Sequence, residues 1–369
     1  MSSRVSAKAS GQVSGQIDRL QALRFVAAFM VLIRHVLMEI EGHGQTVAFG
    51  AELMRVPWGA GVDLFFVISG FIMALIAWDK PAGVMAASDF VARRLIRIWP
   101  TYLIFSVLAV AAIVIVPAGL ENQKIDVAHV IASLTFIPWP RPDDGQLYPV
   151  LGQGWTLNYE MFFYAVLAIF LVAPRAIRFI GVTVVLVVLV IVAAASPLPY
   201  FAEFYGNSIV LEFVLGIGLC WLYRRGVSVP GVMAGLAVLV SMAALFVMES
   251  YPELPRIVSR GLPCSVIVSA VILWRRGEAA LGVKPLPDLG DASYALYLSH
   301  PFVVNALLIV WLKLNGSMET FAAVAIAASV VFSLLFFRFV EKPLRGGMLR
   351  LYDRPGRARA AAAARRDAA

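Results

Sequence analysis

Long apolar stretches separated by short polar connections run through almost the whole chain. A helix needs about 20 mainly apolar residues to cross the hydrocarbon core of a bilayer. Ten windows approach or reach that length, at about 21–40, 60–78, 100–118, 153–173, 179–195, 205–223, 231–249, 259–274, 292–312 and 319–340. The pattern predicts an all-α polytopic membrane protein with about ten transmembrane helices. Nine or eleven are the alternatives, because the fifth and eighth windows are short.

The composition supports a membrane protein and argues against a soluble one. The chain has 369 residues, of which 60% are hydrophobic and 15% charged, and its mean hydropathy is +0.82. Soluble domains are far more polar than this. Cys220 and Cys264 both lie in apolar stretches, which favours packing residues over a disulfide framework, a nucleophile or a metal site. We expect no bound metal.

The chain has a formal net charge of +8, and most of its basic residues lie in the connections between the apolar windows and in the C-terminal tail. With the N-terminus in the cytoplasm, 22 Lys and Arg residues fall on the inner side, 6 on the outer side and 3 within the windows. Positive charge favours the cytoplasmic side of membrane proteins, so the split predicts that both termini are cytoplasmic. The basic residues then contact anionic lipid, and nucleic acid is not an expected partner.

The polar segments divide the chain into three parts. Residues 1–20 contain no apolar signal-peptide core, so they are predicted to be a cytoplasmic N-terminal segment. Residues 21–345 form one transmembrane domain, and 346–369 form a basic Ala/Arg-rich cytoplasmic tail with the composition of a disordered segment. The longest outer connection, at about 119–152, is either a lid that binds substrate or an ordinary structured loop.

Arg24 and His35 are the most informative polar residues, because both lie inside the first window. They are eleven positions apart, which amounts to three helical turns plus roughly 20°, so they share one helix face at about 16 Å along the axis. Charged and imidazole groups are costly inside a membrane and mark functional sites by default. With the predicted orientation, Arg24 is near the cytoplasmic face and His35 is in the outer half.

Asp63 begins the second window, which runs back from the outer side. Its depth is compatible with that of His35. A carboxylate beside an imidazole fixes its tautomer and stabilises the imidazolium, as in a general-base pair. We therefore predict that Asp63 orients His35. The alternative is that Asp63 caps the helix entry or pairs with an arginine of a loop.

Arg94 and Arg97 lie on the inner side, just before the third window. Residues three apart share a helix face, and two guanidiniums placed in this way can bind phosphate oxygens bidentately. The alternative is that they are only positive-inside anchors. The binding hypothesis gains weight because Arg24 lies on the same side of the membrane.

The fourth and ninth windows carry further polar side chains. Trp155 fits the interfacial aromatic belt, and Asn158 and Glu160 could position a hydroxyl acceptor or carry a proton. An interhelical hydrogen bond is the alternative for both. His300 precedes Pro301, whose missing N–H frees a backbone carbonyl, so His300 either helps to position a ligand or is a structural histidine at this kink.

Six segments, taken in order, resemble the acyltransferase-3 family of bacterial integral-membrane O-acyltransferases. They are Leu20–Phe25 with His35, Gly61–Phe71, Arg94 with Arg97, Trp155–Glu160, Ser293–Pro301 and Glu341–Pro343. Each segment alone is a weak signal, but six in register cover nearly the whole membrane domain. Family members of this size without a trailing esterase-like domain resemble exopolysaccharide O-acetyltransferases.

The resemblance implies an enzyme that moves an acyl group, usually acetyl from cytoplasmic acetyl-CoA, to carbohydrate hydroxyls outside the bacterial cytoplasmic (inner) membrane. Acetyl-CoA or another acyl-CoA, such as succinyl-CoA, is then a substrate, and no cofactor is permanently bound. Arg24, Arg94 and Arg97 would hold the CoA phosphates. His35 would be the general base or a transient acyl carrier, oriented by Asp63. The supporting or substrate-binding residues would be Trp155, Asn158, Glu160, Tyr297 and His300.

Two other classes compete with the enzyme. Buried His, Asp and Glu residues in ten spans also suit a transporter or flippase of polysaccharide precursors. The sequence has no detectable repeated halves or paired broken helices, which are common in transporters. The third class is a non-catalytic component of a polysaccharide assembly machine, and proteins of such a machine are also potential partners of an enzyme.

Overall fold

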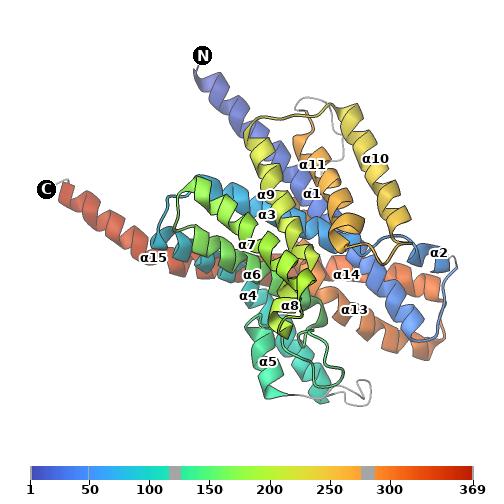
Figure 1. Ribbon diagram of the computed structural model, residues 1–369. Coiled ribbons are helices and arrows are strands. Elements are labelled where there is room, and N and C mark those ends of the chain that lie inside the picture. Colours follow the sequence, from blue (N-terminus) through green and yellow to red (C-terminus); the bar gives the residue numbers. More distant parts are fainter. Residues whose placement is uncertain (1, 49, 116–125, 276–286, 368–369) are drawn as a thin grey trace.

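The computed structural model describes residues 2–48, 50–115, 126–275 and 287–367. Within these ranges the chain folds into a helical bundle from which the two ends project (Figure 1). The described chain has no β-strand beyond a single bridge between Val229 and Trp274. The all-α prediction is therefore confirmed.

The helices follow the apolar windows, with short turns at several of their ends. They are α1 (Ser2–Gly42), α2 (Gly50–Met54), α3 (Ala60–Trp78), α4 (Val84–Ile115), α5 (Val127–Leu134), α6 (Trp155–Phe170), α7 (Arg175–Ala195), α8 (Tyr200–Tyr205), α9 (Leu211–Arg224), α10 (Gly231–Met248), α11 (Leu262–Leu273), α12 (Pro287–Asp291), α13 (Ser293–Leu314), α14 (Met318–Phe336) and α15 (Lys342–Asp367). Two π-helical turns, Ile257–Gly261 and Phe337–Glu341, lead into α11 and α15.

Each of the ten predicted windows falls on a helix. In the part of the chain that the structure describes, six helices are long and apolar enough to cross a membrane, namely α3, α4, α7, α10, α13 and the continuous stretch from α14 into α15. The first window, in α1, contains Arg24, Arg34 and Glu39 as well as apolar residues. The chain is thus a multi-pass membrane protein.

Helix α4 differs from its predicted limits. It begins at Val84 rather than near residue 100, so Arg94 and Arg97 lie within a helix and not in a loop. An ion pair of 2.7 Å between Arg93 and Asp89, four residues apart, stabilises its first turns. Pro100 lies inside the helix and is buried. Transmembrane helices tolerate such prolines when neighbouring groups satisfy the freed backbone.

Both terminal segments are helical where the structure describes them. Helix α1 begins at Ser2, and α15 runs to Asp367, through the tail whose composition resembles a disordered segment. Alanine and arginine both have high helix propensity. The two helices leave the bundle at separate places (Figure 1).

Helix α3 packs closely against two neighbours, and its glycines explain how. A Cβ atom on Gly70 would lie 2.3 Å from the carbonyl oxygen of Phe213 in α9, and one on Gly216 would lie 2.3 Å from that of Val67 in α3. A Cβ on Gly61 would likewise meet the carbonyl oxygen of Ala27 in α1 at 2.3 Å. Small residues allow membrane helices to approach in this way. The glycines of the 61–71 segment therefore fix α3 against α1 and α9.

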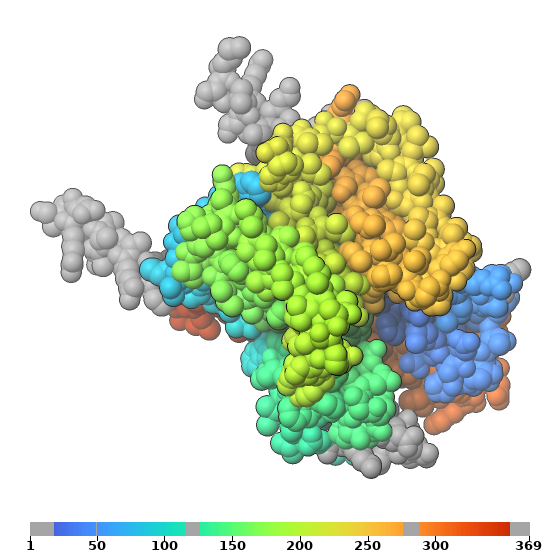
Figure 2. All heavy atoms as spheres, viewed as in Figure 1, coloured from blue at the N-terminus to red at the C-terminus, as the bar shows by residue number. Residues whose placement is uncertain are grey.

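Helices α7 and α10 present apolar side chains outward. Val188 and Ile191 in α7 and Leu239 and Val240 in α10 are all exposed. Helix α10 forms one flank of the molecule in the space-filling view (Figure 2, yellow). Exposed apolar faces of this size mark contact surfaces, and in a multi-pass protein they suit contact with lipid.

The long outer connection is structured where the structure describes it. Asp126 caps α5 by accepting from the backbone N–H groups of Ala128 and His129. The Tyr102 hydroxyl of α4 donates to the Ser133 carbonyl at 3.0 Å, and its ring stacks on Phe136. Residues 116–125 lie outside the described part. The segment from Asp126 onward packs on α4 as an ordered loop.

Candidate active site

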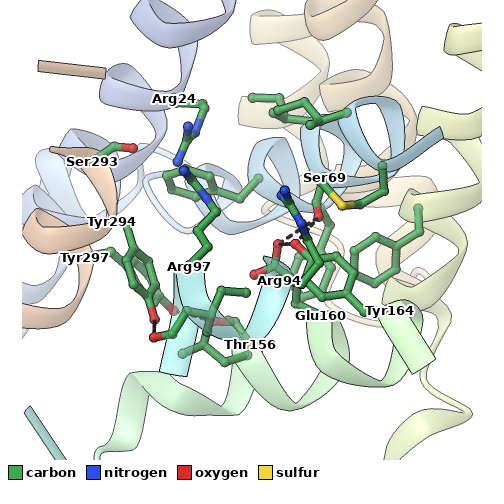
Figure 3. A pocket seen from close by; sticks show the side chains of 18 of the residues that line it. Arg24, Ser69, Arg94, Arg97, Thr156, Glu160, Tyr164, Ser293, Tyr294 and Tyr297 are labelled. Carbon is green, nitrogen blue, oxygen red and sulfur yellow. Dashed lines mark hydrogen bonds between the residues drawn. The ribbon is translucent and has the colours of Figure 1, made fainter. Parts of the chain in front are cut away.

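A cavity of about 400 Å³ lies among α1, α3, α4, α6 and α13. It brings together Arg24, Arg94 and Arg97, three arginines that come from two helices. Figure 3 shows Arg24 and Arg97 pointing toward one another, with Arg94 beside Glu160. All three predicted arginines therefore line the same cavity.

The three arginines are half-buried and have few direct hydrogen bonds to acids. Arg24 donates to Gln21 Oε1 at 3.0 Å, and Gln21 in turn donates to Asp291 at 2.6 Å. The Nε atom of Arg94 is buried and has no hydrogen-bond partner among the described residues. Arginines gathered in a partly dry space attract an anion with several oxygens.

Glu160 supplies negative charge to the same cavity. Its carboxylate accepts a hydrogen bond of 2.8 Å from the Ser69 hydroxyl and another from the Tyr164 hydroxyl. Its charge acts on both Arg94 and Arg24. Glu160 is thus a partnered carboxylate facing the arginines.

Glu341 is a second acid near the arginines. Its carboxylate is 2% exposed, and neither oxygen has a hydrogen-bond partner in the described chain. The charges of Arg97, Arg345 and Arg24 act on it. It ends the π-helical turn before α15, and such turns are frequent at functional sites.

Tyr297 lines the cavity from α13. Its hydroxyl forms hydrogen bonds with the Thr156 hydroxyl at 2.9 Å and the Gln153 carbonyl at 3.0 Å. The aromatic ring contacts Phe65, another lining residue, with 6.1 Å between the ring centroids. Tyr297 therefore joins α13 to the start of α6 at the cavity wall.

Trp155 and Asn158 lie on α6 but do not line this cavity. Trp155 is partly buried and contacts Tyr159 edge-on. The guanidinium of Arg256 lies 5.6 Å from the Trp155 ring centroid. Asn158 is buried, and its amide group has no hydrogen-bond partner within the described ranges.

Asp63 pairs with Arg256, which corrects the predicted contact with His35. Its carboxylate is fully buried and accepts bonds of 2.7 and 3.0 Å from Nε and Nη2 of Arg256. Both oxygens are thereby engaged by a guanidinium, in the fork geometry that arginine favours. Pairing with a loop arginine was one of the two alternative predictions for Asp63.

Glu212 adds another carboxylate beside the pair of Asp63 and Arg256. It is fully buried in α9 and interacts electrostatically with Asp63 and Arg256. A Cβ on Gly261 would lie 3.2 Å from Glu212 Oε1, so the glycine leaves room for the acid. The N-terminal ends of α3, α9 and α11 thus meet around buried charges.

His35 lies against His300 of α13 rather than against a carboxylate. The ring centroids are 4.8 Å apart. His35 is half-buried, whereas His300 is fully buried. Tyr297 lies 6.4 Å from His300, between ring centroids. Side chains in ring contact therefore lead from the cavity wall, through Tyr297 and His300, to His35.

Several members of the site have only weak sequence signals. Tyr164 follows Glu160 by four residues, a spacing that places both on one helix face. Arg256 has no local signal, because its partner Asp63 is 193 positions away. Gln21 and Thr156 act through contacts with other helices. These residues depend on tertiary structure that a local pattern does not contain.

The described residues contain no cluster of three His, Cys, Asp or Glu side chains suited to a metal ion. Cys220 and Cys264 are both free and buried.

The sequence of the chain matches a known class of membrane enzyme. A model of the acyltransferase-3 family, described as an acyltransferase domain, matches residues 17–338. The chain belongs to this family and is an O-acyltransferase.

The similarity extends to individual curated proteins. The chain is 34% identical over 290 residues to the exopolysaccharide production protein ExoZ of Rhizobium meliloti, with 77% of this chain and 89% of ExoZ covered. It is 28% identical over 315 residues to the putative membrane-bound transacylase BcsY of Komagataeibacter xylinus, covering 76% and 75%. It is 24% identical over 324 residues to the peptidoglycan O-acetyltransferase OatA of Listeria monocytogenes, covering 77% and 51%. No solved structure matches significantly.

Proposed function

We propose that this protein transfers an acetyl group from cytoplasmic acetyl-CoA to hydroxyls of an exported polysaccharide. The acceptor class is suggested by the similarity to ExoZ, an exopolysaccharide production protein. In this proposal ten helices cross the bacterial inner membrane and both termini are cytoplasmic. The excess of basic residues on that side supports the orientation.

The arginine-lined cavity carries this proposal. Arg24, Arg94 and Arg97 bind the phosphates of CoA, because guanidiniums form charge-assisted bidentate bonds to phosphate oxygens. A cavity of about 400 Å³ is a typical size for a small-molecule site. It accommodates the pantetheine arm, with the nucleotide toward the cytoplasmic mouth. Phe65 and Tyr297 line the way toward His35.

His35 supplies the chemistry on the acceptor side. Its Nδ1 lies 2.8 Å from the Val31 carbonyl oxygen, which can only accept a hydrogen bond. We therefore assign the proton to Nδ1, which leaves the Nε2 lone pair available. The backbone carbonyl has the orienting role expected of Asp63. With this tautomer, His35 acts as general base or as transient acyl carrier.

Membership of an acyltransferase family favours this enzyme over the flippase and the assembly component. The donor is tested separately, by offering acetyl-CoA and succinyl-CoA to the same preparation. Preferred transfer of succinyl would change the acyl group but retain the reaction class.

Kinetics with reconstituted protein test the donor site. Replacing Arg94 and Arg97 together by Gln should raise the KM for acetyl-CoA. A hydrogen bond to a charged group contributes roughly 1.5–3 kcal/mol, so each lost contact should raise KM by roughly 10- to 150-fold. Arg93→Gln is the matched control, because Arg93 pairs with Asp89 and Asp353 and does not line the cavity. An unchanged KM in the double variant would show that Arg94 and Arg97 do not bind the donor and only help to orient the chain in the membrane.

A further inference from the structure

The imidazole rings of His35 and His300 make the same kind of hydrogen bond through Nδ1. The Nδ1 atom of His35 lies 2.8 Å from the Val31 carbonyl oxygen, and that of His300 lies 2.9 Å from the Leu296 carbonyl oxygen. Each carbonyl belongs to the residue four positions earlier in the same helix. Because a carbonyl only accepts, both rings carry their proton on Nδ1. Each imidazole therefore has its lone pair on Nε2.

The Nε2 atom of His300 is a buried acceptor without a partner. His300 is fully buried, and no described residue donates a hydrogen bond to its Nε2. An unsatisfied buried polar atom is unfavourable, and native structures retain few of them. The His35 ring, tilted by 56°, lies at 4.8 Å between centroids.

We propose that the two imidazoles divide the reaction, with His35 Nε2 carrying the acyl group and His300 Nε2 removing the proton from the acceptor hydroxyl. This inference rests on the proposed acyl transfer to a hydroxyl. An imidazole that is acylated on Nε2 has no free lone pair, so His35 requires a second base. His300 is the base in ring contact with it.

The two steps balance without any further reactant. In the first, Nε2 of His35 attacks the thioester carbonyl, the N–C bond forms, the C–S bond breaks and the CoA thiolate leaves. In the second, the acceptor oxygen attacks the acyl carbon, the O–C bond forms and the N–C bond breaks. The hydroxyl proton moves to His300 Nε2 and is then released, to the CoA thiolate in the overall balance. His35 returns to its starting form.

Asp63 and Glu160, two acids of the site, already have partners. Asp63 accepts two bonds from Arg256, and Glu160 accepts from Ser69 and Tyr164 at the wall of the donor cavity. Their oxygens are committed to holding helices and arginines in place. His300 thus offers a free lone pair directly beside His35.

The test separates the two half-reactions in purified, reconstituted protein. His300→Asn keeps an N–H donor near the position of Nδ1 and removes the Nε2 acceptor. His43→Gln is the matched control, because His43 has the same Nδ1 contact, 2.9 Å to the Glu39 carbonyl, at an exposed position directly after α1. Acetyl-CoA labelled in the acetyl group is added first alone and then with a polysaccharide acceptor. CoA release and protein-bound label are both measured.

We expect the His300→Asn protein to release about one CoA per protein and to retain the labelled acetyl group on His35. Its turnover with acceptor should fall roughly 10²- to 10⁴-fold, which is the range for loss of a general base. His43→Gln should behave as wild type, and His35→Ala should give neither release nor label. Wild-type turnover of His300→Asn would overturn the division, and so would loss of its CoA burst or absence of labelled wild-type protein. If wild-type protein transfers no acyl group to any acceptor, the proposed function itself fails.

Discussion

Asp63 and Arg256 join the first turn of α3 to the turn before α11 through two hydrogen bonds of 2.7 and 3.0 Å. The Asp63 side chain is completely buried, while that of Arg256 is 26% exposed. The same guanidinium lies over the ring of Trp155 in α6. One ion pair thus ties α3 and the turn before α11 together beside α6.

Breaking this pair should destabilise the protein without changing the affinity for the donor. Removal of one partner of a buried ion pair costs about 3–5 kcal/mol, so Asp63→Asn should lower the thermal unfolding temperature markedly. Asp79→Asn is the control, because Asp79 is 68% exposed in its pair with Arg224 and exposed pairs contribute about 0–1 kcal/mol. Equal unfolding temperatures for the two variants would show that the ion pair of Asp63 and Arg256 does not stabilise the fold.

The close contact between α3 and α9 gives a second stability prediction. Gly216→Ala would place a Cβ 2.3 Å from the Val67 carbonyl oxygen, so the two helices must separate and the variant should be strongly destabilised. Gly218, two positions further along α9, has nothing within 4 Å of its Cβ position. Gly218→Ala should therefore be neutral or stabilising by roughly 0.5–1 kcal/mol. Thermal unfolding in one detergent compares the two, and a stable Gly216→Ala protein would refute the packing argument.

Thiol labelling tests the orientation of the chain in the membrane. A cysteine in place of Arg55, in the predicted outer connection, should react with a membrane-impermeant reagent in intact spheroplasts. A cysteine in place of Arg354 should react only after lysis. Both native cysteines are buried, so they should contribute little background. The reverse pattern would contradict cytoplasmic termini.

The outer connection should withstand acid better than most exposed loops. The guanidinium of Arg141 binds Asp144 and lowers the pKa of that carboxyl to about 2. A carboxyl whose pKa is lowered on folding stabilises the loop above its ordinary pKa near 3.8, and this stabilisation is lost as the pH falls toward 2. Limited proteolysis should leave the wild-type loop intact at pH 4 and cleave Asp144→Asn faster. Equal cleavage rates would contradict this.

The sequence predicted the helices well, because they depend on local periodicity. Arg94 and Arg97 share a face by spacing alone, whereas their position beside Arg24 in one cavity depends on how α1 packs against α4. The start of α4 was placed too late, since a charged stretch before Pro100 resembles a loop when neighbouring helices are unknown.

Contacts between distant helices were not predictable in the same way. His35 and His300 were both recognised as candidates, but their contact depends on the relative rotation of α1 and α13. The partner of Asp63 depends on where the turn before α11 packs. The pattern of residues within a single apolar window predicts neither the rotation of a helix nor the segment that packs against it.

The acetyl content of the exported polysaccharide, measured in a deletion strain that carries either the wild-type or the His35→Ala protein, tests the central claim most directly. Our account predicts that His35→Ala reaches the membrane, that the polymer is made in normal yield, and that its acetyl groups are lost. Wild-type acetylation by the His35→Ala protein would contradict the account.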